Sequence, residues 1–140
     1  MYYISGPVTT LKGVKIEYLM KRNEKIAKIL ESKGRQVYLP QRDTNQTQTP
    51  RKIFADNIEA IKKSDGIILI LSDTRGVYLE SGYAKASGKK IIGIQVEETR
   101  ALGSMVRNFL DHVVSNVDEL VILLDVLEKK TKNRKNSNNN

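Results

Sequence analysis

Glu80 is the residue whose type and position most directly suggest chemistry. It follows a continuous apolar run, Gly66 to Leu71, and a polar turn at 72–76, and it falls in the expected first turn of the next helical stretch. Helix N-termini favour negative charge, so we expect an ionised carboxylate. A partly sheltered carboxylate can attack an electrophilic sugar carbon as a nucleophile. Position alone leaves a second interpretation open, in which the acid only complements the helix dipole.

Besides Glu80, a loop and a tyrosine near the N-terminus carry polar groups that could contact a ligand. The loop from Ser5 to Gly13 precedes a predicted helix and offers hydroxyls, backbone amides, a lysine and two glycines. Such a loop can hold an anion, although it matches neither a P-loop nor a GxGxxG pattern, and a plain tight turn is the alternative. Tyr3 lies in the first predicted strand, where core packing is the default interpretation, but its hydroxyl could reach a ligand from the strand end.

These residues must be positioned by elements that alternate along the chain. Apolar runs predict strands at 2–5, 36–39, 66–71, 91–94 and 112–115. Helical spacing predicts helices at 15–33, 50–63, 78–87, 104–110 and 116–127. The helix at 50–63 is expected to turn four apolar residues inward, namely Ile53, Phe54, Ile58 and Ile61.

Strands that alternate with helices predict an α/β fold. We expect a Rossmann-type, flavodoxin-like, doubly wound sheet of five parallel strands in three layers. Ligand chemistry should then collect at the carboxyl ends of the strands. In this chain those ends are followed by the segments 5–10, 40–44, 72–80 and 97–104. Asp65 precedes a strand and so lies at the opposite edge, where we expect a structural role.

The composition limits the classes of function. The 140 residues predict one domain. There is no cysteine and one histidine, which excludes thiolate metal sites and disulfides and disfavours a histidine-built metal site or a Ser-His triad. No apolar run has membrane-spanning length, and the N-terminus lacks the features of a signal peptide. We therefore expect a cytoplasmic protein.

The basic character of the chain is concentrated at its C-terminus. The last twelve residues carry five cations and no acid, whereas the whole chain has a net charge of +8. This low-complexity segment has no core-forming residues, so we predict a domain at 1–128 and a basic, Asn-rich disordered tail at 129–140. A solubilising role is favoured over contact with nucleic acid.

Several motifs together resemble the nucleoside 2-deoxyribosyltransferase superfamily, including its branch of 2′-deoxynucleoside 5′-phosphate N-hydrolases. The strongest carrier is a G-x-x-x-E-x-G-x-A pattern followed by Gly-Lys, in a strand–loop–helix context. The resemblance covers most of residues 1–110. Its motifs are Tyr3-Ile4-Ser5-Gly6-Pro7, the segment 57–65, Gly76 to Ala84, Gly88-Lys89 and Leu102 to Arg107.

The resemblance implies cleavage of an N-glycosidic bond without a metal or other cofactor. Glu80 would attack C1′ of the sugar to form a glycosyl ester, which water or a second base would resolve, and Tyr3 would lie beside the sugar and the nucleophile. Thr74 matches a position that binds either the sugar or a phosphate, and the adjacent Asp73 is a second candidate. Other implied substrate contacts are Ser5, Gly6, Pro7, Gly76, Ser104 and Met105.

The same resemblance implies a homodimer or a higher homo-oligomer. The segment that contains Ser104 and Met105 matches one that the family's dimers insert into the partner's active site. At Gly103 the family has serine or asparagine instead, and Ser104 is the adjacent hydroxyl.

A second departure from the family concerns the proton relay to the leaving base. The family has an aspartate there, whereas this chain has Asn57 with Asp56 beside it, and one helical position turns a side chain by about 100°. An amide does not donate a proton as an acid does. The preferred hypothesis is a nucleoside or nucleotide N-glycosidase or deoxyribosyltransferase. An enzyme like an NAD glycohydrolase is an alternative, and Asn57 motivates a third, a nucleotide sensor with weak catalysis.

Overall fold

The structure, a computed structural model, describes residues 1–9 and 13–137. In that part of the chain five strands form one sheet in the order β2-β1-β3-β4-β5, and every neighbouring pair is parallel. This is the doubly wound, flavodoxin-like order that the sequence predicts. The strands are β1 Tyr2–Ser5, β2 Val37–Tyr38, β3 Gly66–Ile70, β4 Lys90–Ile94 and β5 His112–Val114.

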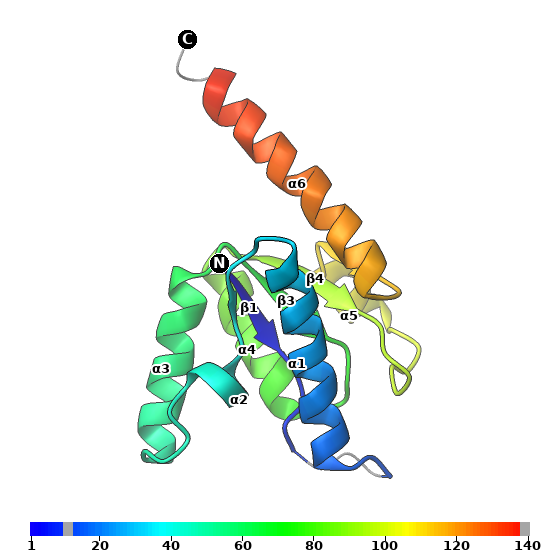
Figure 1. Ribbon diagram of the computed structural model, residues 1–140. Coiled ribbons are helices and arrows are strands. Elements are labelled where there is room, and N and C mark those ends of the chain that lie inside the picture. The colour runs from blue at the N-terminus through cyan, green and yellow to red at the C-terminus, as the bar shows by residue number, and fades with distance from the viewer. Residues whose placement is uncertain (10–12, 138–140) are drawn as a thin grey trace.

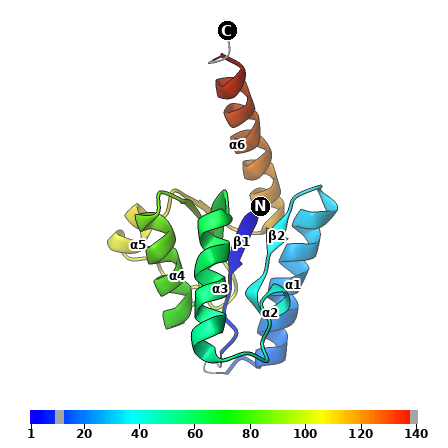
Figure 2. The same cartoon turned by 90° about the vertical axis from the view of Figure 1, so that its left-hand side faces the viewer.

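Helices cover both faces of the sheet and make three layers (Figures 1 and 2). One face packs against α1 (Ile16–Ser32) and the first half of α6 (Val117–Ser137). The other face packs against α3 (Pro50–Lys63), α4 (Arg75–Ala86) and α5 (Ser104–Phe109). All five residues of β3 are buried, as expected for a central strand covered on both sides.

Two helices differ from the sequence prediction in ways that matter for the site. Helix α4 begins at Arg75 rather than near Tyr78, because Thr74 is its extended N-terminal flank and the residues after it already have helical geometry. Glu80 therefore lies in the second turn of α4, not in the first. A short helix, α2 (Pro40–Asp43), follows β2 in a segment for which the sequence predicted no helix, and it has a proline at its start.

The buried face of α3 is also shorter than predicted. Ile61 is buried and Ile53 and Ile58 are half-buried, but Phe54 is 66% exposed. The prediction that Phe54 faces inward is wrong: Phe54 lies on nearly the same side of the helix as Ile61, but only the C-terminal end of α3, at Ala60 and Ile61, is buried.

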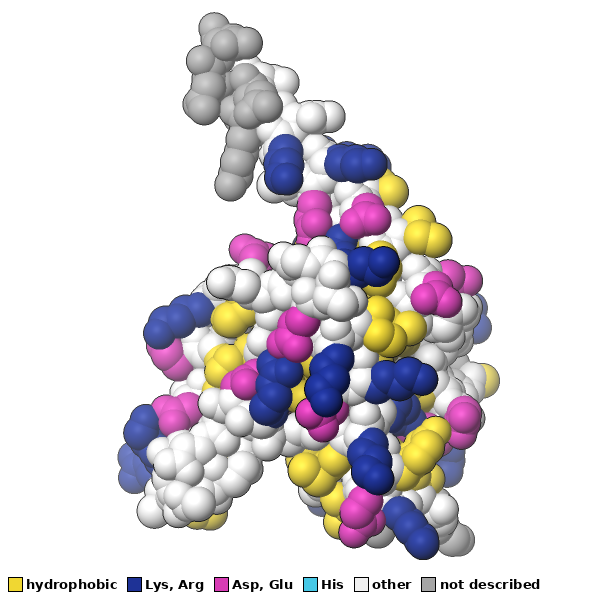
Figure 3. All heavy atoms as spheres, in the orientation of Figure 1, with side chains coloured by type: hydrophobic (Ala, Val, Ile, Leu, Met, Phe, Trp, Pro, Cys, Tyr) yellow, Lys and Arg dark blue, Asp and Glu magenta, His cyan; other side chains and the backbone are white. Residues whose placement is uncertain are grey.

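Helix α6 continues to Ser137, through residues predicted to form a disordered tail. Its first half is anchored by the buried side chains of Leu120 and Leu124, and Lys, Arg and Glu are good helix formers that extend a nucleated helix. The extension projects past the edge of the sheet where the strands begin (Figure 1), and Figure 3 shows its Lys and Arg side chains. Residues 138–140 of the predicted tail lie outside the described part.

The start of the sheet and α6 are joined by polar contacts. Arg35 pairs with Asp125 and Glu128, and Tyr2 donates a hydrogen bond to Glu128 at 3.0 Å. Among residues 1–9 and 13–137, no helix combines the length and the apolar character that crossing a membrane requires.

Candidate active site

The fold brings Glu80 against the end of β1. The Tyr3 hydroxyl donates a hydrogen bond to Glu80 Oε1 at 2.9 Å, and the Ser5 hydroxyl donates one to Oε2 at 2.5 Å. Connections leave β1 and β3 toward opposite sides of the sheet, so their carboxyl ends form the topological switch point at which such folds bind ligands. Both oxygens of the carboxylate are thus held in one orientation at the expected ligand edge.

Burial, rather than the helix dipole, governs the charge of Glu80. Desolvation raises the pKa of Glu80 above its ordinary value, and the hydrogen bonds from Ser5 and Tyr3 oppose this effect in part. Burial and the neighbouring Glu80 charge strongly raise the pKa of Tyr3, so its hydroxyl stays protonated and acts as a donor. The prediction of a first-turn carboxylate stabilised by the dipole is corrected accordingly.

The side chain of Glu80 lines a cavity of about 290 Å³ beside β1 and α1. Its wall combines apolar side chains with carboxamides, as is common in sites for small organic ligands. The apolar lining consists of Ile4, Val8, Met20, Leu39, Pro40 and Ile53. The polar lining consists of Asn23, Gln41, Gln46, Asn57 and Glu80, with Gly6 between them.

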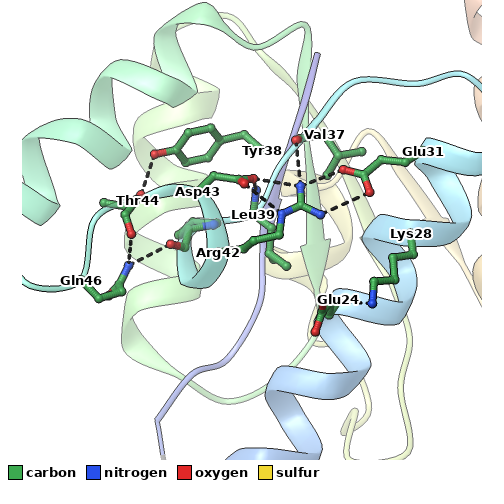
Figure 4. Close-up of polar contacts among 11 residues, drawn as sticks. Glu24, Lys28, Glu31, Val37, Tyr38, Leu39, Arg42, Asp43, Thr44 and Gln46 are labelled. Atoms are coloured by element: carbon green, nitrogen blue, oxygen red, sulfur yellow. Dashed lines mark hydrogen bonds and ion pairs between the residues drawn. The ribbon is translucent and has the colours of Figure 1, made fainter.

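Asn57 is therefore placed in the same cavity as Glu80, although the two come from different helices. Its Oδ1 accepts a hydrogen bond from the Thr44 hydroxyl at 2.6 Å, and the hydroxyls of Thr44 and Tyr38 lie 2.6 Å apart. Figure 4 shows the Tyr38–Thr44 contact from the side of α2. The Tyr38 ring stacks on Tyr3 at a centroid distance of 5.7 Å. Tyr38, whose hydroxyl contacts the Thr44 that donates to Asn57, is therefore in contact with Tyr3, which donates to Glu80.

Asn23 is a cavity residue that sequence reasoning missed. Its fully buried side chain donates to the Pro7 carbonyl at 3.0 Å and to Gln41 Oε1 at 3.1 Å. A Cβ at Gly6 would lie 2.7 Å from Asn23 Oδ1, so Gly6 is needed for this close approach. The available signal was a polar residue on the buried stripe of α1, between Leu19 and Ile26.

The other members of the N-terminal motif surround this contact. The Pro7 carbonyl accepts a hydrogen bond from Asn23, and the absence of a side chain at Gly6 leaves room for Asn23. Residues 10–12 of the predicted anion loop lie outside the described residues. Gln41 lies in α2 and Gln46 follows that helix, which the sequence did not predict. One side of the cavity is thus formed by a segment for which the sequence predicted neither a helix nor a strand.

Two predicted acids lie apart from Glu80. The Asp56 carboxylate contacts Lys52 and Gln48, and these contacts lower its pKa. Asp73 is exposed and pairs with Arg100 at 3.2 Å. Neither acid lines the cavity that contains Glu80 and Asn57.

Thr74 and Gly76 lie at the beginning of α4, between β3 and Glu80. The Thr74 hydroxyl is buried and has no hydrogen-bond partner among the described residues. Gly76 lies in the first turn of α4, with no neighbour close to where a side chain would start. A buried hydroxyl without a partner is costly unless a ligand or water completes it.

Ser104 and Met105 begin α5 and do not line the Glu80 cavity. The Met105 side chain is 83% exposed. The described residues contain no group of three or more His, Asp or Glu side chains arranged to hold a metal ion.

A family profile described as nucleoside 2-deoxyribosyltransferase matches residues 13–122. The chain belongs to this family. Membership points to an enzyme of the deoxyribosyltransferase or N-glycosidase kind that acts on nucleosides. The matched range includes Asn57, Thr74 and Glu80, whereas Tyr3 and Ser5 precede it and join the site through the fold. A search of curated protein sequences found no match.

Solved structures similar to this family member share its fold. The 2-deoxyribosyltransferase of Bacillus psychrosaccharolyticus has a TM-score of 0.68 at 17% identity, over 85% of this chain and 88% of that one. The CMP N-glycosidase of Clostridium botulinum has a TM-score of 0.62 at 22% identity, over 90% and 98%. The corresponding transferase of Leishmania mexicana has a TM-score of 0.54 at 24% identity, over 69% and 64%.

Proposed function

We propose that the protein cleaves the N-glycosidic bond of a nucleoside or nucleoside 5′-monophosphate through a covalent intermediate on Glu80. The observation that carries this proposal is the pair of hydrogen bonds from Tyr3 and Ser5, which holds one half-buried carboxylate beside a cavity at the expected ligand edge of the sheet. Family membership supports the reaction class.

The chemistry asks for little beyond that carboxylate. As the bond from C1′ to the base nitrogen breaks, its electron pair leaves with the base and C1′ becomes oxocarbenium-like. A Glu80 oxygen stabilises this charge and forms the C1′–O bond of a glycosyl ester. Water then gives hydrolysis, and a second base gives transfer. The donors on both oxygens pre-orient the nucleophile, so little reorganisation is needed during attack.

Thr74 favours a substrate with a 5′-phosphate. Its hydroxyl is buried, has no protein partner among the described residues and lies at the N-terminal end of the twelve-residue helix α4. A phosphate oxygen would complete this donor, and the positive end of the helix dipole would favour the added charge. Asp73, which pairs with Arg100, is the less suited neighbour for an anion.

We propose also that the active form is a homodimer in the cytoplasm. Three large apolar side chains on the side of the molecule covered by α3, α4 and α5 are more than 60% exposed, namely Phe54, Leu79 and Met105. A second copy would bury them, and Met105 is free to reach that copy because it does not line its own cavity. Light scattering on the purified protein measures the oligomeric state directly.

The direct test is base release from a panel of nucleosides and 5′-monophosphates, followed by chromatography. The wild-type protein is expected to release base from at least one of them, and Glu80→Gln is expected to release none at a measurable rate. Brief incubation followed by intact-mass measurement should show the sugar attached to the wild-type protein and not to Glu80→Gln. Full activity in Glu80→Gln would refute the covalent mechanism.

One observation favours a second, non-enzymatic function, that of a nucleotide sensor. Asn57 occupies the cavity where an acid would assist the departing base. A nucleotide sensor would bind 5′-monophosphates with measurable heat in calorimetry and release no base, with or without Glu80. Nicotinamide release from NAD distinguishes the NAD glycohydrolase-like alternative from both.

A further inference from the structure

The hydrogen-bond network around Asn57 fixes which end of its carboxamide faces the cavity. The Thr44 hydroxyl has one proton, and it donates that proton to Asn57 Oδ1 while its oxygen accepts from the Tyr38 hydroxyl. Thr44 is almost fully buried, so this chain of donors has no water to substitute for it. Asn57 Nδ2 is then the end left for a ligand.

Each of the other carboxamides of the cavity already donates a hydrogen bond from its NH₂ group to a protein acceptor. Asn23 donates to the Pro7 carbonyl and to Gln41, and Gln41 donates to the Met20 carbonyl. Gln46 donates to the carbonyls of Pro40 and Thr44, and Figure 4 shows Gln46 beside Thr44. Among the described residues, Asn57 Nδ2 is the cavity amide nitrogen without a protein acceptor. It is therefore the donor that a base would meet there.

Among the residues that the structure describes, the cavity also lacks a group that could protonate a base. Its lining includes no Lys, Arg or His, and its one acid is Glu80, which must be ionised to act as a nucleophile. The nearest other acid in sequence, Asp56, is engaged by Lys52 and Gln48 outside the cavity. A primary amide donates a hydrogen bond but does not transfer its proton at ordinary pH. The described part of the site can therefore polarise a departing base by a hydrogen bond, but it offers no acid that would transfer a proton to the base.

Bases differ in whether they need that proton. Adenine, guanine and cytosine are poor leaving groups unless a ring nitrogen is protonated as the glycosidic bond breaks. Uracil and thymine leave as anions whose charge spreads onto carbonyl oxygens, and nicotinamide leaves a pyridinium ring as a neutral molecule. Both of the latter kinds depart with the bond's electron pair and no proton, and both carry a carbonyl oxygen that can accept a hydrogen bond.

We propose that Asn57 makes this site selective for nucleotides whose base departs without a proton, by donating from Nδ2 to a carbonyl oxygen of the base. This rests on the proposed function and names its substrate class. The bond from C1′ to nitrogen breaks as the C1′–O bond to Glu80 forms. The electron pair goes to the carbonyl oxygens of a uracil-type base, which takes its proton later from water, or it neutralises a pyridinium ring.

The test compares base release from the 5′-monophosphates of uracil, cytosine and adenine, each as ribonucleotide and 2′-deoxyribonucleotide, and from nicotinamide mononucleotide. The wild type is expected to release uracil or nicotinamide, and these two arms distinguish the two sources of the shared chemistry. Adenine and cytosine release should be at least 100-fold slower, since a general acid contributes roughly 10²–10⁴-fold. Glu59→Gln, an exposed change on the same helix, is the matched control and should keep the wild-type pattern.

Asn57→Asp supplies the missing acid and is expected to raise adenine and cytosine release by about 100-fold or more. Uracil and nicotinamide release should fall by roughly two- to tenfold instead, because the substitution removes the Nδ2 donor. A variant that only disturbed folding would slow all bases together, so the selectivity ratio reports the role of Asn57 itself. Wild-type release of adenine as fast as uracil and nicotinamide, or an equal effect of Asn57→Asp on every base, would overturn the inference.

The failure of this inference is separable from failure of the proposed function. Base release by Asn57→Asp that requires Glu80, with an inactive wild type, would overturn the selectivity and leave the Glu80 chemistry standing. No base release from any substrate by either protein would overturn the proposed function itself.

Discussion

Tyr3→Phe is the change that most directly tests how the fold activates Glu80. It deletes one hydroxyl, which donates to Glu80 Oε1 at 2.9 Å, and keeps the aromatic ring that stacks on Tyr38. Ser5 still donates to the other oxygen. The substitution therefore removes a single charge-assisted hydrogen bond from an otherwise unchanged core.

The magnitude follows from that bond. A hydrogen bond to a charged group contributes about 1.5–3 kcal/mol. Since about 1.4 kcal/mol is a tenfold change in rate, kcat/KM for base release should fall by roughly 10- to 150-fold near neutral pH. The hydroxyl also lowers the pKa of Glu80, so its removal raises that pKa further. The ionised nucleophile is then lost at a higher pH on acidification, and the ratio of wild-type to variant activity should grow as the pH falls.

Tyr2→Phe is the matched control. Tyr2 is the neighbouring residue, and its hydroxyl also donates to a carboxylate, Glu128 Oε1, at 3.0 Å at the opposite edge of the sheet. We expect this variant to keep wild-type kcat/KM and an unchanged pH profile. A Tyr3→Phe deficit that does not vary with pH, or an equal deficit in Tyr2→Phe, would refute the reasoning that Tyr3 acts through the charge of Glu80.

Three further outcomes are expected. Glu80→Gln should raise the melting temperature at neutral pH, because burial raises the folded-state pKa of Glu80 and ionising it costs stability; calorimetry should show the gain shrinking as the pH falls and the wild-type carboxyl becomes protonated. Thr74→Val should keep the melting temperature, since the Thr74 hydroxyl has no partner among the described residues, and should raise KM for 5′-monophosphates while leaving nucleosides unaffected; equal effects on both would exclude a phosphate contact. Gly6→Ala should lower stability by about 1–3 kcal/mol in denaturant titration, because the added Cβ overlaps Asn23 Oδ1; an unchanged midpoint would mean that Asn23 moves freely.

Local pattern predicted most of the fold because each signal came from neighbouring residues. The unbroken run of β3 required a strand covered on both faces, and the alternation of strands with helices required a parallel sheet. The limits of the helices and the parts of them that are buried did not follow from local pattern, since they depend on packing against distant elements. Phe54 lies on the same apolar stripe as Ile61, yet only the C-terminal end of α3, at Ala60 and Ile61, is buried.

The C-terminal end of α6 is a second case in which local composition did not predict the structure. Its last residues have no core-forming side chains, and composition therefore predicted disorder. The helix is already nucleated by Leu120 and Leu124 in the core, so good helix formers extend it without packing of their own.

The sequence by itself determined the order of the elements, the sheet edge that holds the ligand crevice and the candidacy of Glu80. These follow from hydrophobic periodicity and from a motif whose residues lie close together in the chain. Only the tertiary structure decided that Tyr3, 77 residues away, and Ser5 hold the carboxylate, and that burial rather than the helix dipole sets its charge. It also decided that Asn57 faces the cavity while Asp56 turns to Lys52. Hydrogen bonds and desolvation depend on which segments pack together, and that information is absent from local spacing.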